Sequence, residues 1–203
     1  MGETAANHRY ALSFTSGSLL IREAIVVAPI YLKTQDWREV RRLVQEDNLL
    51  QARTQTSNER RSRETVQRLQ VLTDEELALL VDATSLERAH ILWVAACRRY
   101  ALIGEFAQEV LREKYLLLAG RIDHADFDAF LREKAVWHEE LAQLRTTTLA
   151  KLRATLFRML IEAGFIDEEH RLLETLISGR TRDVLSSRSP SDLHFFPVRG
   201  DAL

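Results

Sequence analysis

The chain has 203 residues, of which 46% are hydrophobic, and its formal net charge is −2. This length supports one sizeable core, or two small bundles that share an interface. The nearly neutral charge excludes a surface that is basic all over, so any binding of nucleic acid must come from a local patch.

Composition also bears on fold class and compartment. Only 7 glycines and 3 prolines leave little turn chemistry for a multi-strand sheet, which predicts an all-α, compact multi-helix bundle. The single cysteine, Cys97, cannot form an internal disulfide and favours a reduced, cytoplasmic setting. The first ten residues lack the apolar core of a secretory signal. The longest apolar run, Ala24–Leu32, has nine residues, well short of the roughly 20 that span a bilayer.

The N-terminal part predicts two helices after a loose lead-in over residues 1–13. Ser18 can cap a helix over about 19–33, which Pro29 should kink or divide. Asp36 can cap a second helix, whose apolar stripe consists of Trp37, Val40, Leu43 and Val44.

An arginine-rich segment follows, from Gln51 to Leu69. Its only acids are Glu59 and Glu64, whereas its arginines are Arg53, Arg60, Arg61, Arg63 and Arg68. Short side chains that can donate hydrogen bonds, such as Thr54 and Ser57, fill the gaps between them. Guanidinium groups with short hydroxyl or amide side chains are the groups that contact phosphate oxygens.

Helical geometry divides this segment into an inner and an outer face. With Asn58 as N-cap, a helix to about Leu72 turns Ser62, Thr65, Val66, Leu69 and Leu72 toward the core. The outer arc then carries Arg60, Arg61, Arg63 and Arg68. Two interpretations stay open. The outer face binds a polyanion, or it is merely a solvated face on which Glu64 pairs with Arg60 and Arg68 at i,i+4 spacing.

The middle of the chain predicts the central element of the fold. Thr73 and Glu76 form a capping box for a short helix to about Asp82. A long apolar helix over about 86–119 then has the character of a bundle's central post, with Trp93 buried and Gly120 just past its end.

The C-terminal part predicts further helices and then an irregular tail. Asp123 caps the next helical segment, a helix from about Thr146 ends at Gly164, and a last helix is expected around 172–177. The tail over 180–203 is irregular and polar except for its apolar stretch 193–198, which is expected to dock on the core. No low-complexity linker interrupts the chain, so residues 1–203 are treated as a single helical domain, compatible with sub-bundles at about 14–84 and 85–180.

Motifs of catalysis are absent from the sequence. It contains no Walker A loop, Rossmann glycine fingerprint, nucleophile elbow or HExxH zinc motif. His124 and Asp128 have metal-binding spacing but lack further ligands, and Cys97 lies in an apolar stretch without a paired histidine. A non-enzymatic protein without cofactor or metal is therefore expected.

Five stretches together resemble the BrxA family of bacterial BREX phage-defence systems. They cover 13–24, 46–64, 72–82, 93–115 and 156–166. The resemblance implies an all-α fold similar to the antitermination protein NusB, and a role as an accessory factor that binds double-stranded DNA. The candidate DNA contacts are Arg53, Thr54, Ser57, Arg60, Arg61, Arg63 and Arg68. Arg22, Arg98 and Arg99 also lie in matching stretches, although Arg99 could instead pair with a carboxylate such as Glu23.

Two alternatives to DNA binding remain. The protein could be an adaptor that assembles other BREX proteins through apolar surface such as Phe195 and Phe196. It could also bind RNA in the manner of NusB, although the arginine segment lacks the aromatic side chains on which RNA bases stack. The sequence leaves the oligomeric state and any preferred DNA sequence open.

Overall fold

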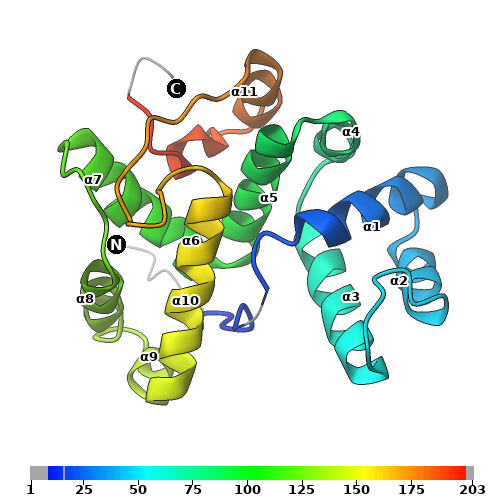
Figure 1. Cartoon of the computed structure of the whole chain (residues 1–203), viewed down its shortest axis with the longest axis horizontal. Coiled ribbons are helices and arrows are strands. Elements are labelled where there is room, and N and C mark those ends of the chain that lie inside the picture. Colours follow the sequence, from blue (N-terminus) through cyan, green and yellow to red (C-terminus); the bar gives the residue numbers. More distant parts are fainter. Residues whose placement is uncertain (1–8, 16, 200–203) are drawn as a thin grey trace, which may run out of the picture.

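The computed structural model describes residues 9–15 and 17–199, and this part of the chain is helical (Figure 1). The helices are α1 (Ile21–Thr34), α2 (Trp37–Glu46), α3 (Gln55–Leu69), α4 (Asp74–Asp82), α5 (Ser85–Arg99), α6 (Ala101–Phe106), α7 (Glu113–Leu116), α8 (His124–Lys134), α9 (Glu139–Ala142), α10 (Thr146–Glu162) and α11 (Gly179–Ser186). A π-helical stretch, η1 (Ala107–Arg112), joins α6 to α7, and a 3₁₀ helix, η2 (Asp192–Phe195), follows α11. The described residues form two isolated β-bridges and no strand, which confirms the all-α prediction.

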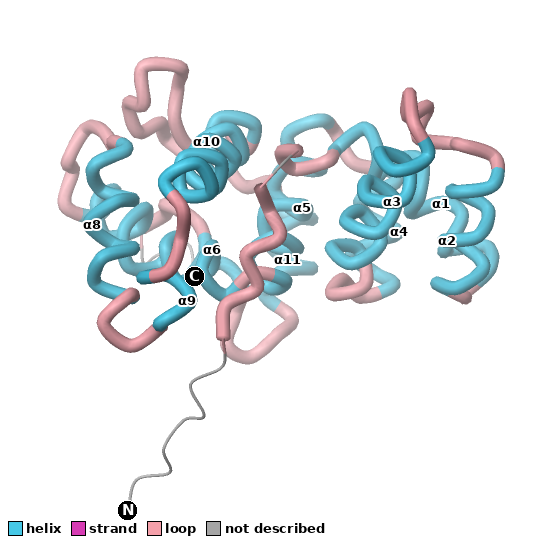
Figure 2. The backbone as a smooth tube through the Cα atoms, turned by 90° about the horizontal axis from the view of Figure 1, so that it is seen from below, coloured by secondary structure: helices cyan, strands magenta, loops and turns pink. Residues whose placement is uncertain are grey.

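The helices form two groups with α5 between them (Figures 1 and 2). Helices α1 to α4 pack together at one end, and α6 to α10 lie at the other. The segment before α1 ties the groups together, because the backbone N–H of Tyr10 donates to Glu140 (2.7 Å) and that of Leu19 donates to Glu162 (2.8 Å). One cluster of buried residues runs through the described part of the molecule. The division of the chain into sub-bundles at about residue 84 stays a prediction. No helix within the described ranges is both long and apolar enough to cross a bilayer.

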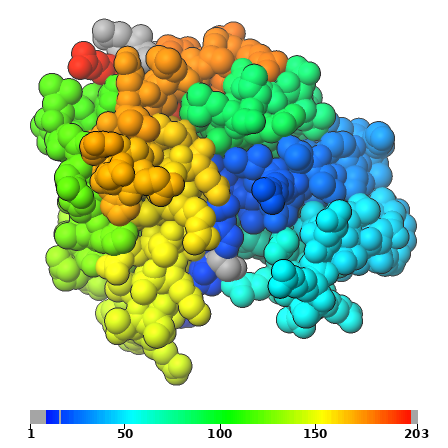
Figure 3. All heavy atoms as spheres, viewed as in Figure 1, coloured from blue at the N-terminus to red at the C-terminus, as the bar shows by residue number. Residues whose placement is uncertain are grey.

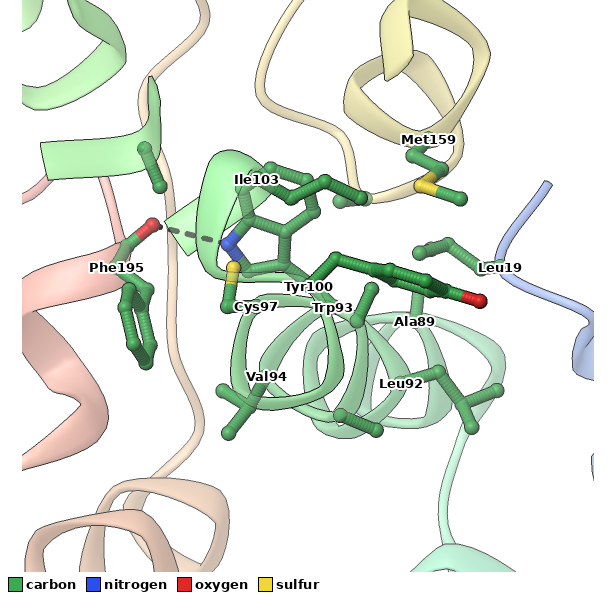
Figure 4. Packing of buried hydrophobic residues seen from close by; sticks show 14 of the residues in the cluster. Leu19, Ala89, Leu92, Trp93, Val94, Cys97, Tyr100, Ile103, Met159 and Phe195 are labelled. Carbon is green, nitrogen blue, oxygen red and sulfur yellow. Dashed lines mark hydrogen bonds between the residues drawn. The ribbon is translucent and has the colours of Figure 1, made fainter. Parts of the chain in front are cut away.

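The core centres on α5, as its apolar sequence predicts. Trp93 is fully buried, and its indole N–H donates to the carbonyl oxygen of Phe195 (2.9 Å). Figure 4 shows Cys97, Ile103 and Met159 around this ring. The apolar stretch 193–198 therefore docks on the core, as predicted. The similarity of the fold to NusB stays a prediction.

The long helix predicted over 86–119 is interrupted at Tyr100. Tyr100 has extended backbone angles (φ −124°, ψ 95°), so α5 ends at Arg99 and α6 begins at Ala101. Tyr100 is buried, and its hydroxyl donates to Glu64 on α3. Beyond the break α6 approaches α5 so closely that a Cβ on Gly104 would lie 3.2 Å from the carbonyl oxygen of Cys97.

Several helix ends differ from the prediction. Pro29 lies inside α1 without dividing it. Helix α3 starts after Thr54, not at Asn58, because the Thr54 side chain accepts from the backbone N–H of Ser57. Asn58 is buried instead and donates to the carbonyl oxygen of Gln45 (3.0 Å). The predicted caps at Asp36, Thr73 and Asp123 are confirmed.

The segment expected to be helical around 172–177 is extended. Leu172 forms a bridge with Ile166, and its backbone N–H donates to the carbonyl oxygen of Gly120 (2.9 Å). The tail is also more regular than predicted up to Arg199, because Ser178 caps α11 and the η2 turn follows. Residues 200–203 of the predicted tail lie outside the described part.

Candidate nucleic-acid interface

Helix α3 lies at one end of the molecule (Figure 1), and three of its four arginines are exposed. Six of the candidate residues are exposed there: Arg53, Thr54, Ser57, Arg60, Arg61 and Arg63. Inward residues of the same helix are buried, including Ser62, Thr65, Val66 and Leu69. The predicted division into an inner and an outer face is therefore confirmed for most of the helix.

Arg68 is the exception, because it is 1% exposed and cannot meet a ligand at the surface. Its Nε donates to Glu64 (2.8 Å), and its Nη1 donates to the carbonyl oxygen of Ser18. Its guanidinium carbon lies 5.6 Å from the centre of the Tyr100 ring. The last turn of α3 packs between the segment before α1 and the end of α5, which covers this part of the outer arc. The placement of Arg68 among the DNA contacts was wrong.

The Glu64 carboxylate takes part in this buried hydrogen-bond network. One of its carboxylate oxygens accepts from both Arg68 and the Tyr100 hydroxyl. Burial, followed by the hydrogen bond to Glu64, raises the pKa of Tyr100. The ion pair expected between Glu64 and Arg60 does not form, since the Arg60 Nη2 donates to the Thr15 hydroxyl instead (3.0 Å). The solvated-face interpretation depends on two ion pairs of Glu64. The pair with Arg60 does not form, and the pair with Arg68 is buried.

The remaining exposed arginines are weakly neutralised or not at all. Arg61 has a loose ion pair with Glu23, at 3.7 Å between Nε and Oε1. Neither Arg53 nor Arg63 makes a side-chain hydrogen bond or ion pair within residues 9–15 and 17–199. Positive charge is thus available on this face although the whole chain is nearly neutral.

Two of the hollows that border α3 meet at Arg60 and Glu64. The first, of about 700 Å³, lies between α3, the start of α1 and the end of α10, and its lining includes Arg22, Arg61 and Glu162. Figure 3 shows the surface hollowed between the yellow α10 and the cyan α3. The second, of about 430 Å³, is lined by Ser13, Thr15, Arg60, Arg63, Glu64, Gln67 and Arg99. The arginines therefore border concave surface, which can surround an anionic group.

Three further arginines have distinct places. Arg98 is largely buried and pairs with Glu76 and Asp192, so it holds α5, α4 and η2 together. Arg99 does not pair with Glu23. It lies over the Tyr100 ring at 5.1 Å and donates weakly to Gln67 (3.3 Å). Arg158 on α10 was missed by the sequence reasoning, and its Nη1 donates to the carbonyl oxygen of Gly17 (3.2 Å). Its place beside the first hollow depends on how distant elements pack, which no local pattern reveals.

The surroundings of His124 and Cys97 do not favour metal binding or thiol chemistry. No cluster of three or more potential ligands among His, Cys, Asp and Glu occurs in the described part of the chain. The His124 ring packs against Phe157 and His170. Cys97 is buried, and burial raises the pKa of its thiol well above the usual value, which disfavours the reactive thiolate.

Comparison with known proteins identifies the family. Residues 8–189 match the model of the BrxA family, which covers most of the chain. The chain belongs to the BrxA family. The BREX protein BrxA of Paramagnetospirillum magneticum (strain ATCC 700264 / AMB-1) is 24% identical over 182 residues, covering 89% of this chain and 92% of that protein. The BREX protein BrxA of Escherichia coli O9:H4 (strain HS) is 25% identical over 179 residues, covering 87% and 84%.

A solved structure confirms the fold of this BrxA family member. The crystal structure of an uncharacterized protein from Magnetospirillum magneticum superimposes with a TM-score of 0.77 at 22% identity, covering 93% of this chain and 96% of that one. At this level of identity the similarity concerns the fold alone. The assignment to the family therefore rests on the sequence match, and the solved structure supports the fold.

Proposed function

We propose that this BrxA protein is a non-enzymatic component of a BREX anti-phage system that binds duplex DNA through the phosphate contacts of α3. Its contacts are the exposed side chains Arg53, Thr54, Ser57, Arg60, Arg61 and Arg63. Under this proposal it acts in the cytoplasm, where DNA and a reduced Cys97 would both be found.

One observation carries the proposal. The exposed surface formed by Arg53 before α3 and by Arg60, Arg61 and Arg63 on α3 is called the arginine face. Of the two carboxylates of α3, Glu64 is engaged by buried Arg68 and Tyr100, and Glu59 accepts from Gln55 (3.1 Å). Within the described residues, Arg60 and Arg63 therefore form no ion pair. An exposed helix that served only solvation would be stabilised by pairing its own charges. Unpaired guanidinium groups at concave surface favour binding of an external anion.

The dimensions of the face suit a duplex. Thr54, the N-cap of α3, and Arg63 are nine residues apart, which corresponds to about 14 Å along an α-helix. At 3.4 Å per base pair, this length spans about four steps of B-DNA. The face can therefore reach more than one phosphate of a strand, and because phosphates carry no base information, sequence preference should be weak.

RNA binding in the manner of NusB is the weaker nucleic-acid candidate. Single-stranded RNA is commonly held by exposed aromatic side chains on which its bases stack. Among the described residues, neither of the two hollows that meet at Arg60 is lined by an aromatic side chain. The smaller one is lined mainly by hydroxyl and guanidinium groups, which suit a phosphate backbone.

An adaptor that assembles other BREX proteins is a second candidate, on a surface different from the predicted one. Phe195 and Phe196 are buried and cannot serve. A leucine patch is exposed after α7 and in the extended segment, consisting of Leu116, Leu117, Leu118, Leu173 and Leu176. Exposed apolar patches often mark protein interaction sites, and this one lies away from α3 (Figure 1). Pull-down of purified BREX proteins by the wild type and by Leu117→Asp with Leu176→Asp would test this candidate.

Fluorescence anisotropy titrations test the DNA-binding proposal. Labelled duplex DNA, single-stranded DNA and RNA of equal length would be titrated at two salt concentrations. We expect the duplex to bind best, with similar affinity for unrelated sequences and a log–log salt slope of about −0.9 per neutralised phosphate. Preferred binding of single-stranded RNA, or no binding of any nucleic acid at low salt, would overturn the proposal.

A further inference from the structure

The smaller hollow beside α3 gathers three guanidinium groups from two helices. Arg60 and Arg63 come from α3, and Arg99 comes from the end of α5. We name this hollow of about 430 Å³ the arginine pocket, and its other lining residues are Ser13, Thr15, Glu64 and Gln67. The break at Tyr100 ends α5 at Arg99, beside α3, so the pocket depends on tertiary structure and not on the arginine-rich segment alone.

Neutral partners hold two of these guanidinium groups in place. The Thr15 hydroxyl accepts from Arg60 (3.0 Å), and the Gln67 side-chain oxygen accepts from Arg99 (3.3 Å). Arg99 also lies over the Tyr100 ring at 5.1 Å. A neutral partner fixes an arginine without cancelling its charge, which reduces the ordering cost when an anion arrives. Arg63, which also lines the pocket, has no side-chain hydrogen bond or ion pair among the described residues.

The pocket keeps a net positive charge in spite of Glu64. Buried Arg68 donates to this carboxylate at 2.8 Å, so the two charges form a pair behind the pocket. Three guanidinium groups therefore face the hollow with one carboxylate that is already compensated. Arginine forks favour planar, bidentate contact with oxyanions, and phosphate groups are among the oxyanions that they bind best.

We propose that the arginine pocket is a discrete phosphate-binding site, in which Arg99 supplies a guanidinium group from outside α3. The inference rests on the proposed function in taking this phosphate from the DNA backbone. It adds a contact residue on α5 and a defined seat for one phosphate group. The Arg60 and Arg99 side chains approach the phosphate from opposite helices, and Arg63 closes on it when it binds.

Inorganic pyrophosphate is a probe for the pocket that does not require DNA. Thermal unfolding of the full chain would be followed with pyrophosphate and with sodium chloride at equal ionic strength. We expect pyrophosphate at about ten times its Kd to raise the unfolding midpoint by roughly 3 °C relative to chloride. Arg99→Gln and Arg63→Gln should each lose most of this shift. Arg63→Gln serves as the second variant because Arg63 makes no side-chain hydrogen bond or ion pair within residues 9–15 and 17–199.

Arg22→Gln is the matched control. Arg22 is an exposed arginine next to α3, but it lines the other hollow. This variant should keep the pyrophosphate shift, and in duplex titrations Arg99→Gln should weaken binding about tenfold, more than Arg22→Gln does. Equal losses in the Arg22 and Arg99 variants would overturn the pocket, because they would indicate a general effect of charge.

The two proposals can fail separately. Duplex binding that depends on Arg60 but not on Arg99, without a pyrophosphate shift, would overturn the pocket and leave DNA binding by α3 intact. A pyrophosphate shift that requires Arg63 and Arg99, without binding of duplex DNA, would support the pocket and overturn the proposed function. In that case the phosphate would belong to another ligand.

Discussion

Trp93 is the residue on which most of the central packing depends. Its indole ring is fully buried among α5, α6 and α10 and donates its N–H to Phe195 at 2.9 Å (Figure 4). We expect Trp93→Ala to lower the free energy of unfolding by about 3–5 kcal/mol, because it leaves a large cavity and an unpaired carbonyl group. Urea denaturation would measure the loss. Trp93→Phe, which keeps most of the volume, should lose less, and equal midpoints in the wild type and Trp93→Ala would contradict this account.

His90 gives the fold a dependence on pH. Burial lowers the pKa of His90 to about 4, from 6.5 in an unfolded chain. The unfolded chain therefore takes up a proton first as pH falls, so this contribution is complete above pH 6.5 and is lost between pH 6.5 and 4. We expect up to about 3 kcal/mol of stability to depend on this group. Urea midpoints at pH 7.5 and 5 should differ more in the wild type than in His90→Gln. The same pH dependence in both proteins would assign the effect to other groups.

Arg68 and Arg63 are neighbours on one helix with opposite roles. Arg68 is buried and pairs with Glu64, whereas Arg63 is exposed and unpaired within the described part of the chain. Arg68→Met should cost roughly 3 kcal/mol of stability, because it leaves the Glu64 carboxylate without its cation. Arg63→Ala should change stability by less than about 0.5 kcal/mol. Chemical denaturation of the two variants checks this order, and a larger loss in Arg63→Ala would reverse the assignment.

At the scale of elements, the η2 turn depends on an ion pair with α5. Asp192 accepts from Arg98 at 2.6 Å, and Arg98 also binds Glu76 next to the start of α4. We expect Asp192→Ala to release the segment after α11, with a loss of roughly 3 kcal/mol. Limited trypsin digestion should then cleave faster after Arg188. Asp183→Ala removes an exposed carboxylate of α11 and should digest like the wild type. Unchanged digestion of the Asp192 variant would show that the apolar contacts alone hold this segment.

The starts of α2, α4 and α8 were predictable because their signals are local. Thr73 and Glu76 satisfy each other's backbone groups within four residues, and Asp123 caps α8 in the same manner. The break at Tyr100 was not predictable, because the apolar periodicity continues across it. At the break, Tyr100 donates to Glu64, which lies 36 residues earlier, so the local pattern does not contain this contact.

The extended segment after Gly164 was likewise not predictable from its local sequence pattern. Leu172, Leu173, Leu176 and Ile177 have helical spacing, which is why a helix was predicted there. The backbone instead donates to Gly120 and Phe165, at 2.9 Å each. Hydrogen bonds to segments distant in sequence outweigh a short amphipathic pattern, since an isolated helix of six residues is barely stable.

For the candidate site, the sequence indicated which arginines leave the core but not what covers them. A helical wheel places Arg68 on the outer arc, although the segment before α1 and the end of α5 bury it. The same packing brings Arg99 to the pocket beside Arg60. The burial of Arg68 and the position of Arg99 both depend on how α3 packs against α5. The sequence pattern of a single helix does not predict this packing.

At the scale of the whole molecule, the arginine face and the leucine patch lie apart. The arginine face of α3 lies at one end, and the leucine patch lies beyond α5 near the end of α7 (Figure 1). A protein arranged in this way can hold DNA at one end and leave the other free for protein partners. Charge variants made at the two ends should therefore differ in their effect on DNA binding.

Duplex binding by a double variant tests the central claim most directly. Arg60→Ala combined with Arg63→Ala removes two exposed guanidinium groups from α3 without touching its buried face. The control is Arg132→Ala combined with Arg145→Ala, two exposed arginines of the opposite half. Anisotropy titrations over a range of salt would be compared for both variants and the wild type.

We expect the α3 variant to keep its unfolding midpoint, to bind unrelated duplexes more weakly by a similar factor, and to reduce the salt slope by roughly two units. The control should bind like the wild type. An α3 variant that is folded and binds duplex DNA with unchanged affinity and salt slope would contradict the account, and the arginine face would then be an ordinary solvated surface.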